Sequence, residues 1–212
     1  MKLVVSVVLS WLVAAASARA QEPPPRIPII VIDVQGSVPR FPPDPILAAS
    51  RGISETELPG AGLGGQLGAH LYFFKFKAVT FGVGGQAVVT RAKQTPPDNV
   101  QNQIKAVTEK FRSLGAQLSL NFGTGSGWSY LSGGIGRSNW SVVPEGRAPL
   151  DVDQEALKTI NYGGGARWFA KTHLAFSFDV RLYAINPGTA SAGYPASPRT
   201  TFMVIGAGLS LK

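Results

Sequence analysis

Four charged residues in otherwise uncharged, alternating segments are the first candidates for chemistry in this chain. Asp179 and Arg181 lie two positions apart, so in a β-strand both side chains point to the same face. Asp33 is expected to reach this pair across a narrow interior, and Arg167 to lie lower, near a turn. Burying an unpaired charge is costly. We therefore predict an internal ion-pair network that fills the structure, with a gate or plug as the functional alternative.

The two histidines of the chain, His70 and His173, are the candidates for acid–base catalysis. Both are predicted to face the interior from separate strands, and neither has an evident acidic partner in the sequence. A lipid-modifying enzyme of the acyl hydrolase or transferase type would need a histidine beside a serine and an acid. The sequence specifies no such arrangement, so we predict no catalytic residue and keep the lipid-modifying enzyme only as an alternative.

Two patterns resemble ligand motifs without the context that each requires. The segment 60–65 matches G-x-G-x-x-G, but a dinucleotide site needs a helix after it, and here an alternating pattern follows. The acidic segment 151–155 alternates like a calcium loop, yet the sixth and twelfth loop positions hold Ala156 and Tyr162 instead of Gly and Glu. We predict a solvated loop at 151–155, and no metal or cofactor.

Eight segments alternate apolar and polar residues, which is the period of a β-strand. In residues 174–182 the apolar set is Leu, Phe, Phe, Val and Leu, and the intervening residues are Ala, Ser, Asp and Arg. Only residues 100–110 indicate a helical period. The predicted strands are residues 27–38, 62–76, 79–92, 111–122, 128–140, 159–169, 173–184 and 200–211.

The connections between these strands alternate in length. Those after the second, fourth and sixth strands are tight, and the other four are long and rich in Pro, Gly and polar residues. Transmembrane barrels have short periplasmic turns and longer outer loops. With both termini on the periplasmic side, the alternation predicts an all-β fold, an eight-stranded antiparallel up-and-down transmembrane β-barrel.

The polar face of the predicted strands indicates which side meets lipid. It consists mainly of Gly, Ser, Thr, Gln and Asn, and charged residues make up only 15% of the chain, against about 25% in soluble domains. Small polar residues suit the narrow lumen of an eight-stranded barrel. The apolar face is therefore predicted to meet lipid, and a soluble lipocalin-like barrel is the alternative. A membrane-interface girdle is predicted from Trp128, Tyr130, Trp140, Trp168, Phe169 and Tyr183.

The N-terminus has the features of a secretory signal peptide. Lys2 precedes an apolar run, and Ala18 and Ala20 are the small residues that a signal peptidase reads. We predict a cleaved signal peptide at 1–20, a short periplasmic segment at 21–26 and the barrel domain at 27–212. An uncleaved N-terminal anchor is the alternative. Export to the bacterial outer membrane follows, and the absence of cysteine excludes a lipoprotein anchor.

The formal net charge of +8 is spread along the chain. No Lys/Arg cluster is interleaved with aromatic residues, so we predict no nucleic-acid partner. A diffuse basic surface favours contact with outer-membrane lipid and with anionic lipopolysaccharide.

The stretch YGGGARWFAKTHLAFSFDVRLY at 162–183 and the closing strand TTFMVIGAGLSLK resemble the OmpA/OmpX-like outer-membrane β-barrel domains. In that family a Gly-rich strand, a tight turn and a strand with inward Asp and Arg form the penultimate hairpin. The resemblance implies the barrel architecture and insertion by the barrel-assembly machinery. Members usually end in an aromatic residue that this machinery reads, whereas this chain ends in Leu211-Lys212.

Because no catalytic or cofactor-binding arrangement is specified, we predict an integral outer-membrane protein with a structural or surface-interaction role, without catalysis or a cofactor. A narrow channel for small or hydrophobic solutes is the alternative function.

Overall fold

The computed structural model describes residues 30–95, 105–123, 126–190 and 193–212, which form a closed barrel. Each strand pairs antiparallel with the next, and β1 also pairs with β8. The predicted fold class is confirmed, whereas the predicted signal peptide and segment 21–26 lie outside the described residues. The strands are β1 (Ile30–Arg40), β2 (Leu63–Phe76), β3 (Val79–Gln94), β4 (Val107–Phe122), β5 (Gly127–Pro144), β6 (Leu157–Lys171), β7 (Leu174–Ile185) and β8 (Thr200–Leu211).

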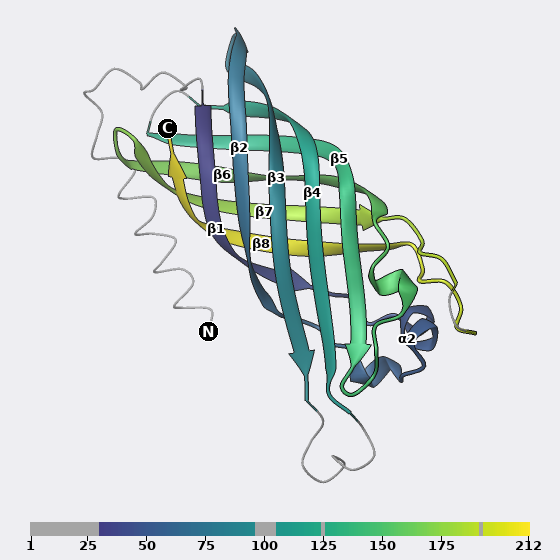
Figure 1. Ribbon diagram of the computed structural model, residues 1–212. Helices are drawn as coiled ribbons and strands as arrows, with labels where there is room; N and C mark the ends of the chain where they lie inside the picture. The colour runs from purple at the N-terminus through teal and green to yellow at the C-terminus, as the bar shows by residue number, and fades with distance from the viewer. Residues whose placement is uncertain (1–29, 96–104, 124–125, 191–192) are drawn as a thin grey trace.

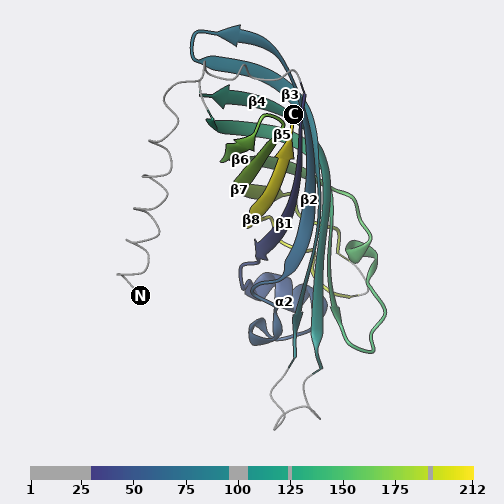
Figure 2. The same ribbon diagram turned by 90° about the vertical axis from the view of Figure 1, so that its left-hand side faces the viewer.

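The strands run obliquely around the barrel, with the C-terminus at one end and the long connections at the other (Figures 1 and 2). β3, β4 and β5 extend further towards the long connections than predicted. The predicted helix at 100–110 is wrong where the structure describes it, because residues 107–110 pair with both β3 and β5. Residues 100–104 lie outside the described part of the chain.

Burial alternates along the strands with the phase that the sequence predicts, except at the end of β2, where residues 73–76 are all exposed after a register shift. Leu118 is 69% exposed on the outer face, and its neighbours Gln117 and Ser119 are buried inside. Large apolar side chains cover the outside, and the polar side chains of the strands face the lumen, which is the reverse of a soluble lipocalin-like barrel.

The predicted aromatic girdle is wrong for five of its six members. Trp168 is 52% exposed on the outer face, but the other five aromatic side chains are buried in the lumen. The phase of the alternation explains this, because Trp128 and Tyr130 are in step with the inward-facing Ser132. Proximity to a strand end therefore does not decide which face an aromatic residue occupies.

The first long connection contains a short helix that the sequence analysis did not identify. Helix α2 (Pro45–Arg51) is preceded by its N-cap residue Asp44, whose carboxylate accepts hydrogen bonds from the backbone N–H groups of Ile46 and Leu47. It ends at Gly52, which adopts the left-handed conformation that favours glycine. Seven residues are too few for a helical period to stand out. The described long connections also contain two single turns of 3-10 helix, η1 (Glu55–Glu57) and η3 (Asp151–Asp153).

Helix α2 lies at the end of the barrel opposite the C-terminus (Figure 1). Its Leu47 and Ala48 pack in one hydrophobic cluster with inward side chains of the strands. No helix among the described residues is long and apolar enough to cross a membrane.

Candidate functional site: the lumen network and the basic outer wall

Side chains fill the barrel lumen in three tiers. The tier nearest the tight turns is apolar and the middle tier is polar. The outer tier, nearest the long connections, is a second apolar cluster, which includes α2. The tier nearest the tight turns consists of Val31, Tyr72, Trp128, Phe169 and Ala175. The outer tier consists of Phe41, Leu47, Ala48, Leu58, Val88, Ala92, Val107, Phe111, Trp140, Val142, Leu157, Tyr183, Ile185, Phe202 and Val204.

The middle tier contains a buried ion pair between β1 and β6. Arg167 donates from Nε and Nη2 to the two carboxylate oxygens of Asp33, at 2.9 and 2.7 Å. The Ser210 hydroxyl donates to the same carboxylate. The guanidinium of Arg167 also lies 4.0 Å from the centre of the Tyr130 ring. This two-point geometry is the strongest form of an arginine–carboxylate contact.

A second buried ion pair joins neighbouring positions of β7. Arg181 Nη2 donates to Asp179 Oδ2 at 3.1 Å and to Ser132 Oγ at 2.7 Å, and Nη1 donates to Asn161. The Tyr130 hydroxyl donates to Asp179 Oδ2 at 2.7 Å. Because Tyr130 contacts both ion pairs, it connects them into one network.

The structure therefore brings together the four charged residues singled out in the sequence, but in a different pairing. Asp33 bonds to Arg167 and not to the Asp179–Arg181 pair. Strands in a closed barrel are tilted and staggered, so distance from a turn does not give height in the lumen. The sequence did not single out Gln117 and Tyr130 as neighbours of these charged residues. The alternation of β4 and β5, which places both side chains on the inward face, was the signal that could have identified them. That the network is structural remains a prediction.

His70 occupies the lumen, as predicted, and has an acidic neighbour that the sequence did not reveal. Its Nδ1 lies 3.7 Å from Asp33 Oδ2, and its Nε2 lies 3.2 Å from Gln117 Oε1. The prediction for His173 is wrong, because it is exposed in the turn between β6 and β7. The two histidines thus form no joint site. No group of side chains suited to hold a metal ion occurs among the described residues.

Arg51, at the end of α2, joins three of the long connections by hydrogen bonds at their end of the barrel. Its Nε donates to Asp153 Oδ1 at 3.1 Å, and its Nη1 donates to Ser197 Oγ at 3.0 Å. Asp153 also accepts from the backbone N–H groups of Val142 and Leu150. The prediction of a solvated loop is wrong for Asp153, which is buried because it is the counterion of Arg51.

The outward face of four neighbouring strands changes from apolar to basic towards the long connections. On β4, outward Leu118 and Leu114 are followed by Arg112 and Lys110. Cross-strand pairing sets Leu114 opposite Arg137, and Arg137 opposite Lys158. We call the resulting exposed row the basic belt. It comprises Arg91, Lys93, Lys110, Arg112, Arg137 and Lys158.

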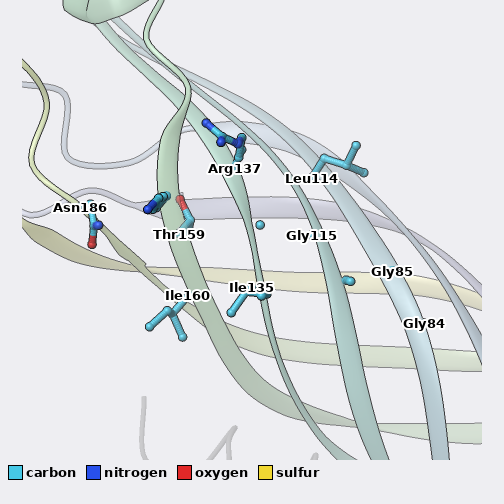
Figure 3. Close-up of a pocket in the computed structure, with 12 residues that line it drawn as sticks. Gly84, Gly85, Leu114, Gly115, Ile135, Arg137, Thr159, Ile160 and Asn186 are labelled. Carbon is cyan, nitrogen blue, oxygen red and sulfur yellow. The ribbon is translucent and has the colours of Figure 1, made fainter.

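Two hollows in the outer wall adjoin the basic belt. The first, of about 660 Å³, lies over β3–β5 and includes the first four belt residues together with Arg147. The second, of about 950 Å³, lies nearer the tight-turn end of the barrel and is called the apolar hollow here. Figure 3 shows Arg137 beside it. Its lining includes Gly85, Leu114, Ala116, Ile135, Ile160 and Lys158.

Solved structures, but no family model or curated protein, match this chain. Among solved structures, Neisserial surface protein A superposes with a TM-score of 0.56 at 12% identity, over 87% of this chain and 97% of that one. The attachment invasion locus protein Ail of Yersinia pestis, in complex with the heparin analogue sucrose octasulfate, gives 0.50 at 14%, over 86% and 97%.

This chain has the fold of the small outer-membrane β-barrels. The identities are low enough that the likeness carries the fold alone, and neither ligand nor partner.

One titratable group of the barrel stands out at the end with the long connections, beyond the apolar band of the outer face. Glu109 on β4 is buried in the outer tier, further towards the long connections than the outward-facing Arg112. Its Oε1 accepts from Trp140 Nε1 at 2.7 Å, and its Oε2 has no hydrogen-bond partner among the described residues. Burial raises the pKa of Glu109 to about 8, although the Trp140 hydrogen bond and the charge of Arg51 oppose the shift.

We expect the free energy of unfolding of the barrel to fall as pH rises from about 4.5 to about 8. The folded pKa of Glu109 is the higher one, so the folded state holds the proton that the unfolded chain has already released. Glu109→Gln should remove a contribution on the order of 4 kcal/mol from this pH dependence. Urea unfolding in detergent micelles across this pH range measures it. Identical slopes for both proteins would contradict the assignment.

Proposed function

We propose that the protein is an integral outer-membrane barrel with a sealed lumen, which acts through its outer surface and as a structural element of the membrane. The observation that carries the proposal is the burial of the lumen charges. Arg167 is 0% exposed, and Asp179 and Arg181 are each 1% exposed. A water-filled pore would leave its lining side chains accessible to water.

Location in the bacterial outer membrane belongs to the same proposal. The exposed Leu, Ile, Val and Phe side chains on the outer face of the strands support it, because an apolar surface of this extent is unfavourable in water. The predicted signal peptide at 1–20 would direct export of the chain to the periplasm and would then be removed. Insertion by the barrel-assembly machinery would then close β8 against β1.

The proposal includes no catalysis. His70 is 5% exposed inside the barrel, and its neighbour Asp33 is already held by Arg167 and Ser210. This arrangement supports a packing role for His70, because a substrate would have to displace one of the apolar tiers to reach it. The alternative of a narrow solute channel meets the same obstacle.

We expect the purified, folded protein to give no ion conductance in planar lipid bilayers, because its lumen charges are paired and sealed between two apolar tiers. Gel migration of unheated and boiled samples verifies that the protein in the assay is folded, since a closed barrel changes mobility when boiling unfolds it. Reproducible current steps from the folded protein would favour the channel and overturn the sealed lumen.

A further inference from the structure

We infer that the outer wall of β3–β6 binds a phosphorylated, acylated glycolipid of the lipid A type from the outer leaflet. The inference rests on the proposed membrane location. The apolar hollow would hold an acyl chain, and the basic belt would bind the phosphate groups. The two features are continuous, because Arg137 and Lys158 belong to the belt and also line the hollow.

The hollow lies on the lipid-facing wall because small residues stand between large ones. Leu114 and Ile135 are 69% and 72% exposed. Beside them, Ala116 of β4 pairs with Gly85 of β3 and with Ile135 of β5, so this part of the wall carries little or no side chain. A Cβ at Gly85 would lie 3.3 Å from the backbone oxygen of Gly115, so the floor of the hollow is the strand backbone itself. In a bilayer, an apolar depression of this kind is filled by lipid chains.

The charge of the basic belt is largely uncompensated. Within the described parts of the chain, Lys93 alone among the belt residues forms an ion pair, with Glu145 at 3.9 Å. Asp153 also lines the hollow over β3–β5, but its carboxylate is engaged by Arg51. Arginine and lysine side chains at this height are suited to bind phosphate oxygens.

The order of the two features favours a glycolipid over a soluble polyanion. The cations lie towards the long connections and the apolar hollow lies towards the membrane interior, which matches a phosphorylated headgroup above acyl chains. A soluble sulfated or phosphorylated glycan would use the belt and leave the hollow without a ligand. A phospholipid of the inner leaflet would lie at the wrong end of the barrel.

Three probes separate the contributions in native mass spectrometry of the folded, detergent-solubilised protein. They are lipid A, its deacylated bisphosphorylated disaccharide, and dephosphorylated lipid A. We expect lipid A to bind most tightly, because it alone occupies both the belt and the hollow.

Two pairs of variants test the residues. Removing both charges in Arg112→Gln/Arg137→Gln should weaken lipid A binding about thirtyfold, given the contribution of each basic residue near an anionic lipid surface. Lys75→Gln/Lys171→Gln removes the same charge at the periplasmic end and should leave binding unchanged.

The second pair fills space instead of removing charge. Ala116→Phe places a ring in the hollow and should weaken lipid A binding, but not binding of the deacylated disaccharide. Ala207→Phe is its control, because Ala207 is equally exposed on the outer face of β8, away from the hollow.

Equal binding by the belt variant and its periplasmic control would overturn the proposal. Tight binding of the disaccharide that matches lipid A, with no effect of Ala116→Phe, would also overturn it and assign the belt to a soluble polyanion. Neither result bears on the proposed sealed lumen, because conductance and gel migration of the same preparations test that proposal separately.

Discussion

Replacing Arg167 with glutamine should lower the free energy of unfolding of the barrel by about 3–5 kcal/mol, because it leaves a buried carboxylate without its counterion. Arg167 makes two hydrogen bonds to Asp33 and stacks on the Tyr130 ring, all without exposure to solvent. Tyr130 in turn holds Asp179. The substitution should therefore weaken the Asp179–Arg181 pair as well as remove the Asp33–Arg167 pair.

The paired variant Asp33→Asn/Arg167→Gln separates charge burial from simple loss of contacts. It removes both charges, so we expect it to be more stable than Arg167→Gln alone. Urea titrations in micelles, followed by gel migration and fluorescence, measure both variants. A double variant that is less stable than the single one would show that packing, and not the uncompensated charge of Asp33, dominates at this site.

The second large effect is expected on the opposite face of the wall. Leu118→Arg should lower the free energy of unfolding by about 2–4 kcal/mol, because it places a charge near the middle of the lipid-facing band. Leu118 is 69% exposed and lies on the same strand and face as Arg112, six positions closer to the tight-turn end of β4. The substitution thus places an arginine, which is native at position 112 on the same face, near the middle of the apolar band.

Refolding titrations into lipid vesicles compare Leu118→Arg with Leu118→Ala, which shortens the side chain without adding charge. Gln117→Ala is not a neutral control, because Gln117 is hydrogen-bonded to His70, Gln86 and Asn161. If arginine and alanine at position 118 prove equally tolerated, the outer face of β4 does not meet lipid.

Strand positions and their faces were predictable because alternation is a local property of the chain. The eighth strand has the predicted bounds, and the seventh begins one residue later than predicted. In β7 the inward phase of Asp179, Arg181 and Tyr183 follows directly from their spacing. The loop-length pattern then predicted the order and direction of the strands, because each tight turn forces its two strands to pair.

The sequence by itself determined the eight strands, their antiparallel order and the polar interior, since these depend on neighbouring residues. The tertiary structure alone decided the Asp33–Arg167 pair, the bridging role of Tyr130 and the basic belt. These depend on the tilt and stagger with which separate strands meet, which set the height of each side chain in the barrel. The belt illustrates this: Arg112 and Arg137 lie on separate strands, and only the register places both above the apolar hollow.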